Sequence, residues 1–320
     1  MNFIAVLAAL GLEQWRAFGP RVALERAFIR YARALERRLN GGSAQQGAVA
    51  LTLALAPPVV VAAGIFFALA ALHPVLALAW NIAALYALMG FRRFSHAFSE
   101  VGAALRANDL NAARRALAAW WGEALGELTS GDVAKLAIER GLIDSYRHVF
   151  ATLFWFTLLP GPAGAVLYRA SALLADEWRA APRGDDQTPI VQARDRFGRP
   201  ARDLLWLLDW VPVRLTALSF AVVGDFEDAV YCWRTQARGW AAYEGGTHAG
   251  IVLASGAGAL GVTIGGPLPV LGGEPDYRPE LGVGDAADAD VLPSAAGLVW
   301  RALVLWLLLM LLLTLANLAP

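Results

Sequence analysis

The chain has 320 residues, of which 58% are hydrophobic and 17% are charged, and its formal net charge is zero. A soluble domain carries about 25% charged residues, so this composition favours an integral membrane protein. The neutral balance excludes a globally basic nucleic-acid-binding protein. Cys232 is the single cysteine, so no internal disulfide can form; in apolar sequence it is more typical of a small buried residue than of a nucleophile.

Seven apolar segments are expected to cross the membrane or to dip into it. The clearest is 297–318, because a long stretch without charge follows Arg301 and reaches the length of about 20 residues that spans a bilayer. The pattern predicts an all-α polytopic integral membrane protein that forms a single membrane domain over 1–320. The segments are 1–18, 48–72, 74–91, 148–168, 204–224, 250–267 and 297–318.

Two of these segments are expected to be broken or re-entrant rather than straight helices. Within 148–168, the residues Pro160–Gly164 include two prolines and two glycines, which interrupt a simple helix. The stretch 250–267 is apolar but rich in glycine, which makes it a poor helix in free contact with lipid. We therefore expect 250–267 either to pack closely against neighbouring elements or to turn back.

Two amphipathic helices are predicted outside the membrane core, at 19–40 and 94–121. In the first, arginines recur every three to five residues with apolar residues between them, which is the pattern of a helix with one apolar face. Within the second, Asn108 and Asp109 indicate a break, with Asp109 as the N-cap of the following turn.

The first candidate site lies in the apolar segment 204–224. Asp209 and Arg214 are five residues apart with Pro212 between them, and charged side chains within a membrane segment are energetically costly. Two interpretations stay open. The pair could form a polar site facing the bundle interior, or it could stabilise a kinked helix as an ion pair.

The second candidate site precedes the apolar run that begins at residue 148. Glu139, Asp144 and Arg147 are spaced so that a helix could bring them near one another. They could face a ligand cavity at the membrane boundary, or they could form interfacial salt bridges. His148 adds little, since the histidines show no pair at metal-binding spacing and no cysteine supports them.

Several motifs resemble the family that joins AmpE, an inner-membrane protein of the β-lactamase induction system, to CobD/CbiB, the membrane adenosylcobinamide-phosphate synthase of cobalamin assembly. The segment that most closely resembles AmpE is LDWVPVRL at 208–215. CobD/CbiB is resembled by LRANDLNAARRAL at 105–117, YRA at 168–170 and GALGVTIGGP at 258–267. The resemblance extends from about residue 90 onward, and it implies that Tyr168 and Arg169 contribute to ligand binding.

The chain departs from the synthase pattern at several positions where the resemblance implies carboxylates or other polar groups. Ile143, Arg147 and Ala175 stand at three of them, although Glu139 is kept. Loss of hard oxygen ligands implies loss of a Mg²⁺–nucleotide site. The resulting hypothesis is an AmpE-like, non-catalytic regulatory or ligand-sensing protein of the bacterial inner membrane, with no cofactor and no metal.

Two further hypotheses remain beside this one. The chain could be a cobalamin biosynthesis enzyme that uses ATP and Mg²⁺ to join aminopropanol phosphate to a corrinoid through an amide bond. It could also be a transporter, since broken helices and intramembrane charges are common in that class. The expected partners are the lipid bilayer, a small-molecule ligand and a second copy of the chain, with no nucleic acid.

The distribution of cations predicts the orientation of the chain. The segments 13–46, 92–147 and 169–203 hold seven, eight and seven cations, whereas 273–290 holds six acids and one arginine. Short basic segments resist translocation, so we expect these three to face the cytoplasm and the acidic segment to face the other side. The test is labelling from the periplasm of single cysteines at Arg183 and Asp288 in a Cys232→Ser background. Labelling at 183 but not at 288 would contradict the orientation.

Overall fold

The computed structural model describes residues 2–15, 18–122, 127–179, 196–243, 245–268 and 276–316, apart from the side chains of residues 93 and 94. These residues are mostly helical, which confirms the predicted all-α class. Contacts divide the chain into unit 1, residues 1–89 and 151–210, and unit 2, residues 90–150 and 211–320. The helix α11 (Arg199–Val223) begins in unit 1 and ends in unit 2. The prediction of a single membrane domain over 1–320 stays a prediction.

Three helical stretches among the described residues are long and apolar enough to cross a membrane, which supports a membrane protein. They are Ala44–Leu72, Arg199–Val223 and Ala289–Ala316, and they match the predicted segments 48–72, 204–224 and 297–318. The first is α3, and the last comprises the short 3-10 helix η3 (Ala289–Val291) and α14 (Leu292–Ala316). The helices α1 (Asn2–Trp15) and α4 (Pro74–Leu88) are apolar but shorter.

Unit 1 contains the predicted interruption of segment 148–168. Helix α8 (Ala151–Leu158) ends before Pro160, and α9 (Ala163–Glu177) begins after Pro162, so the expected break is confirmed. The two helices then approach closely at Gly164. A Cβ atom at Gly164 would lie 1.9 Å from the carbonyl oxygen of Trp155, so no larger residue fits without moving the backbone.

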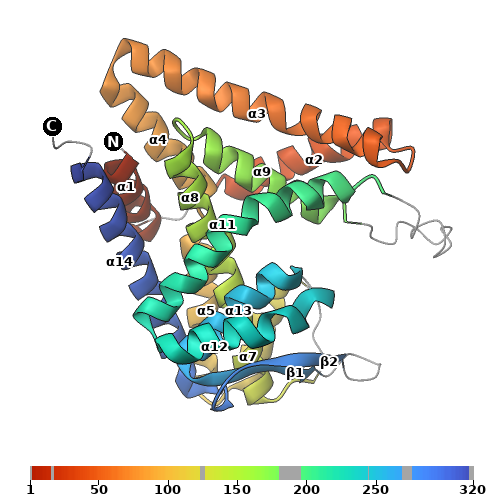
Figure 1. The fold of residues 1–320 in the computed structure, drawn as a ribbon, viewed down its shortest axis with the longest axis vertical. Coiled ribbons are helices and arrows are strands. Elements are labelled where there is room, and N and C mark those ends of the chain that lie inside the picture. The colour runs from red at the N-terminus through yellow and green to blue at the C-terminus, as the bar shows by residue number, and fades with distance from the viewer. Residues whose placement is uncertain are drawn as a thin grey trace. The chain divides into compact units, whose positions relative to one another are not determined.

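The remainder of unit 1 packs around a core that combines alanines with larger apolar side chains. In Figure 1, α3 and α4 form a hairpin, and the Trp80 indole donates a hydrogen bond to the Ala62 carbonyl at 3.1 Å between them. The amphipathic helix α2 (Arg21–Leu39) confirms the prediction over 19–40 and packs against α3 and α9. Small residues allow such close approach of helices. The alanines of this core are Ala32, Ala50, Ala54, Ala170 and Ala201.

In unit 2 the predicted amphipathic helix 94–121 is instead two helices. Helix α5 (Phe91–Arg106) ends before Asn108, which adopts a left-handed conformation with φ of 56°, and α6 (Leu110–Trp121) follows. The Asp109 side chain accepts a hydrogen bond from the Ala112 N–H at 2.9 Å. The predicted break and the N-cap at Asp109 are therefore confirmed, and the amphipathic stretch 94–121 consists of two helices.

The Gly-rich segment 250–267 is not one membrane element. Helix α13 (Gly246–Leu260) is buried from His248 to Ala259, which confirms the expected close packing. After Gly261 the chain forms the strand β1 (Val262–Leu268), which sequence analysis did not predict. Helices α7 (Ser130–Ser145) and α12 (Phe226–Gln236) and the 3-10 helix η2 (Ala237–Ala242) pack against α13.

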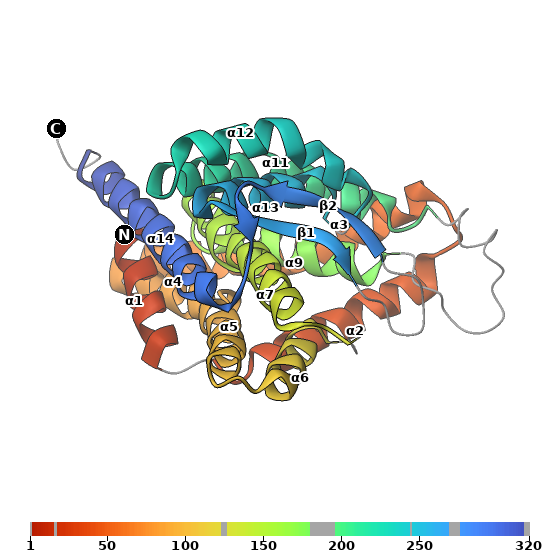
Figure 2. The ribbon, with the colours of Figure 1, turned by 90° about the horizontal axis from the view of Figure 1, so that it is seen from below.

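The described part of the acidic segment 273–290 also contains strands. Strand β2 (Asp276–Gly282) pairs antiparallel with β1, and the short β3 (Asp285–Ala286) pairs parallel with β1 on its other side. The register between β1 and β2 shifts between Gly265 and Pro267. Figure 2 shows β1 and β2 side by side, and both α7 and α13 contact this hairpin.

Gly164→Ala tests the close approach of α8 and α9. The added Cβ must displace the Trp155 carbonyl, so we expect the variant to be less stable by about 1–3 kcal/mol in detergent unfolding experiments. Gly64→Ala in α3 is the matched control, because no atom lies within 4 Å of its added Cβ. Equal stability of the two variants would contradict the packing described for Gly164.

Candidate functional site

Unit 2 contains a buried ion pair between Glu139 and Arg278. The Glu139 side chain, on α7, is 5% exposed, and that of Arg278, on β2, is 8% exposed. Arg278 Nη1 donates to Glu139 Oε2 at 2.7 Å, and Nη2 donates to Oε1 at 3.2 Å. The Gly265 N–H of β1 also donates to Oε1, at 2.9 Å. One carboxylate therefore joins α7 to both strands of the hairpin.

The local sequence explains how this contact forms. Gly265 has a φ of 78°, and a Cβ atom there would lie 2.2 Å from the Pro279 carbonyl oxygen, so glycine is required where β1 turns its N–H toward Glu139. On the other side, the Arg278 guanidinium lies over the Trp240 ring, 5.5 Å from the ring centre. The face of an aromatic ring stabilises a cation that has lost its hydration shell.

Asp144 forms a second polar group on the same helix. Its Oδ2 accepts a hydrogen bond from the Trp120 indole at 2.9 Å, and its Oδ1 lies 3.3 Å from Arg140 Nε. The Arg140 contact has the distance of an ion pair but not the geometry of a hydrogen bond. The Arg140 guanidinium also lies over the Trp121 ring, 5.5 Å from its centre. Asp144 is thus held by α6 and α7.

Arg147 and His148 follow in a single π-helical turn, η1 (Tyr146–Phe150), and both are half-buried. Turns of this kind are rare and occur frequently at functional sites. In α13, His248 is buried, and burial together with the positive charge of Arg214 lowers the pKa of its imidazole to about 4. His248 is therefore neutral at pH 7.

Asp209 has a buried polar partner in unit 1. In unit 1, the Tyr168 hydroxyl donates to Asp209 Oδ1 at 2.9 Å, and both residues are buried. The helix α11 continues through Pro212, so the directions of Asp209 and Arg214 on it differ by about 140°. Arg214 is half-buried and lies on the part of α11 that belongs to unit 2.

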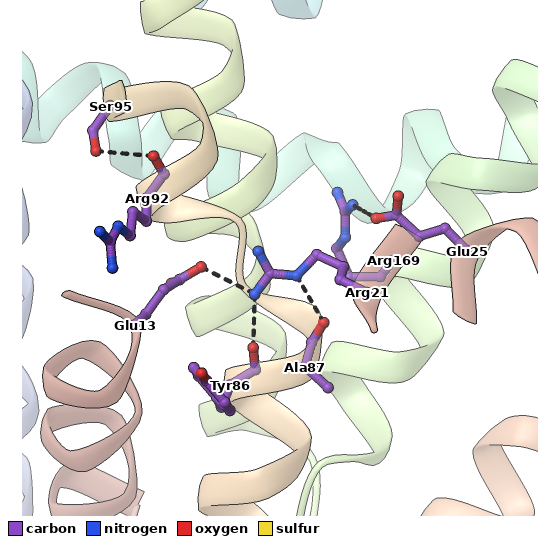
Figure 3. A network of polar contacts seen from close by, with 8 residues as sticks. All are labelled: Glu13, Arg21, Glu25, Tyr86, Ala87, Arg92, Ser95 and Arg169. Carbon is purple, nitrogen blue, oxygen red and sulfur yellow. Dashed lines mark hydrogen bonds and ion pairs between the residues drawn. The ribbon is translucent and has the colours of Figure 1, made fainter. Parts of the chain in front are cut away.

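Arg169 lies next to Tyr168 and is also buried in unit 1. Its Nη2 donates to Glu25 Oε1 of α2 at 3.3 Å. Figure 3 shows this contact together with Arg21, which sequence analysis did not single out as a site residue. Arg21 donates to Glu13 at 3.0 Å and to the backbone carbonyls of Tyr86 and Ala87.

Sequence analysis also did not predict Arg278 and Gly265 as site residues. Arg278 was the only cation in a segment with six acids, so its neighbours in the sequence offered local partners and nothing there pointed to Glu139. Gly265 was one of many glycines, and nothing in its sequence distinguished it. The ligand-binding roles of Asp209, Arg214, Glu139, Asp144, Arg147, Tyr168 and Arg169 stay predictions.

The described residues do not fit a metal ion held by the protein alone. No group of three or more His, Cys, Asp or Glu side chains comes together among them. Both oxygens of Glu139 accept hydrogen bonds from Arg278 or Gly265, and both oxygens of Asp144 contact Trp120 or Arg140. These carboxylates neutralise arginines and orient the backbone rather than form a cation site.

Comparison with known proteins gives matches along almost the whole chain. The family model described as CobD/Cbib protein matches residues 4–299. The cobalamin biosynthesis protein CobD of Stutzerimonas stutzeri (strain A1501) is 36% identical over 314 residues, which cover 97% of each chain. The protein of the same name from Chromobacterium violaceum is 36% identical over 261 residues, covering 82% of this chain and 77% of that one. No solved structure matches.

These comparisons correct the leading functional hypothesis. The relatives are named for cobalamin biosynthesis, so the hypothesis of an AmpE-like, non-catalytic regulator is wrong, and its signalling role has no support. The substitutions at Ile143, Arg147 and Ala175 occur in a chain that is 36% identical to a CobD protein over 314 residues. The findings favour the alternative, cobalamin biosynthesis.

Tyr168→Phe tests the buried hydrogen bond to Asp209. The variant leaves a buried carboxylate with one donor fewer, so we expect a loss of about 1.5–3 kcal/mol in the free energy of unfolding in mixed micelles. Tyr31→Phe is the matched control, since the Tyr31 hydroxyl donates to the Leu53 carbonyl from an exposed position. A loss at Tyr168 no larger than at Tyr31 would show that the Asp209 contact contributes little.

Proposed function

The chain belongs to the CobD/CbiB protein family, and from this premise we propose that it is a membrane-bound enzyme of cobalamin biosynthesis. The observation that carries the proposal is the alignment with the CobD protein of Stutzerimonas stutzeri, which covers 97% of both chains. We place the protein in the bacterial inner membrane with several passes, in contact with the bilayer and with its substrates.

The proposed reaction joins a phosphorylated amino alcohol to a carboxylate of a corrinoid through an amide bond. A free carboxylate is a poor electrophile, so a carboxylate oxygen must first accept a phosphoryl or adenylyl group from ATP, with release of ADP or pyrophosphate. The amine nitrogen then bonds to the carboxyl carbon and loses a proton, and the activated oxygen leaves on phosphate or AMP. The reactants carry several negative charges, and guanidinium groups stabilise phosphates and developing oxyanions. Support comes from the arginines grouped near Glu139 and Asp144 in unit 2, namely Arg140, Arg147 and Arg278.

Within this proposal Glu139 is a positioning residue. It fixes the Arg278 guanidinium and the Gly265 N–H, and through them the hairpin that follows α13. Because the described carboxylates do not form a metal site, Mg²⁺ would enter together with ATP as part of the substrate. A nucleotide-bound Mg²⁺ keeps waters and phosphate ligands and needs only one or two protein carboxylates. No catalytic step is assigned to a metal held by the chain.

The proposal predicts amide formation by membranes that contain the chain. Incubation with ATP, Mg²⁺, aminopropanol phosphate and a corrinoid acid should give a product whose mass equals the sum of the corrinoid and the amine minus one water, detected by liquid chromatography and mass spectrometry. Glu139→Gln should lower the rate about tenfold or more, because it releases Arg278 and the hairpin. Glu177→Gln, which alters a carboxylate paired with the more exposed Arg33, should leave the rate unchanged.

Membranes containing the Stutzerimonas stutzeri protein serve as the positive control, and membranes without either protein serve as the blank. Absence of product from the folded wild-type chain, under conditions in which the positive control turns over, would contradict the proposed reaction. Equal rates for the two glutamate variants would contradict the positioning role of Glu139 while leaving the reaction itself intact.

A further inference from the structure

Unit 1 contains a cavity of about 160 Å³ whose lining includes Arg169, a residue that the sequence resemblance implied for ligand binding. Helices α2, α3, α4 and α9 line it, and its ionisable lining residues are Arg21, Glu25 and Arg169. The other lining residues are Pro58 and Ala, Val, Leu and Phe side chains. A buried water needs about 10–15 Å³, so the cavity could hold a group of several non-hydrogen atoms.

Arg21 is a fixed cation at this cavity. Its side chain is 7% exposed, and three hydrogen bonds hold it through Nε and Nη2. The partners are Glu13, Tyr86 and Ala87, which belong to α1 and α4 (Figure 3). The guanidinium is therefore already oriented before any ligand arrives, which reduces the entropy lost on binding.

Arg169 is less completely paired. Its side chain is 8% exposed, yet its only hydrogen bond among the described residues is the 3.3 Å contact from Nη2 to Glu25. A guanidinium carries several further N–H donors, and leaving them buried without acceptors is costly. Glu25 is 23% exposed, so its carboxylate has access to solvent.

We propose that this cavity binds the phosphate group of a phosphate ester, with Arg169 and Arg21 as donors and with Glu25 as the counter-ion that the phosphate displaces. A phosphate offers several acceptor oxygens and enough negative charge to contact two guanidinium groups at once, which a single carboxylate does less well. The apolar lining suits the carbon part of such an ester. One such ester is the phosphorylated amino alcohol of the proposed reaction, and for that ligand the inference rests on the proposed function. Binding is measured without amide formation, so the two proposals can fail separately.

A phosphate ester could reach this site either as a soluble molecule or as the headgroup of a phospholipid. The amphipathic helix α2, which carries Arg21 and Glu25, packs against the long apolar helix α3, and such helices lie at the membrane surface. The experiment therefore uses one probe of each kind. O-phosphoethanolamine is the soluble probe, and a short-chain phosphatidylglycerol is the lipid probe.

Binding is measured by calorimetry on the full chain in dodecyl maltoside, a detergent without phosphate. We expect at least one probe to bind, while ethanolamine and a short-chain diacylglycerol, which lack the phosphate, do not. Arg169→Gln should weaken binding about tenfold or more, because it removes charge-assisted hydrogen bonds. Arg30→Gln, which changes an exposed arginine of α2 outside the cavity, should have no effect.

Glu25→Gln distinguishes a ligand site from a purely structural ion pair. Removing the competing carboxylate should tighten binding about threefold, whereas a structural role predicts no gain in affinity. This variant keeps the test informative if Arg169→Gln fails to fold. The proposal would be overturned if neither probe binds, if the analogues without phosphate bind equally well, or if Glu25→Gln does not tighten binding.

Discussion

The ion pair between Glu139 and Arg278 is the contact on which the structure of unit 2 depends most. The two residues are 139 positions apart in the sequence, and their side chains are only 5% and 8% exposed. Either charge alone in this environment would be strongly destabilising, so each is tolerated only because the other is present. The Gly265 N–H uses the same carboxylate, so β1 and β2 are both held to α7 by one side chain.

A second contact orients the same hairpin from α12. The Gln236 amide donates to the Gly282 carbonyl at 2.9 Å and accepts from the Gly282 N–H at 2.6 Å. These are the bonds that a neighbouring strand would otherwise supply at the end of β2. The hairpin of an otherwise helical chain is thus fixed by side chains from two helices, which gives Arg278 a defined position over Trp240.

Unit 1 also contains buried charged side chains, and these have polar partners within the protein. Arg21, Arg169 and Asp209 are all buried, and their contacts are with Glu13, Glu25 and Tyr168. Lipid cannot solvate such groups, so a chain with this hydrophobicity must pair its charges within the protein. The least complete of these arrangements, at Arg169, is the one that borders a cavity.

Local signals in the sequence predicted the features that depend on nearby residues. The two prolines and two glycines at 160–164 gave the break between α8 and α9, and Asp109 gave the N-cap of α6. The strand β1 was missed because its apolar, Gly-rich sequence follows a helix and carries no alternation of apolar and polar residues. Glu139 was identified as a candidate, but its partner Arg278 depends on tertiary structure, which residue spacing does not reveal.

The functional error has a similar cause. The hypothesis depended on missing carboxylates of a metal site, but the described residues form no such site. The family relationship rests instead on similarity along almost the whole chain. The arginines that contact the remaining carboxylates were not visible as a group, since Arg140 and Arg278 come from α7 and β2. The site around Glu139 and Asp144 is defined by pairs of carboxylates and arginines, not by the number of acidic residues.

The most direct test of this account is a double-mutant cycle on Glu139 and Arg278. The free energy of unfolding in mixed micelles is measured for the wild type, Glu139→Gln, Arg278→Gln and the double variant. The account predicts a coupling free energy of about 2 kcal/mol or more, because either single change leaves a buried charge without its partner. Additive effects, with a coupling below about 0.5 kcal/mol, would contradict the central role of this ion pair.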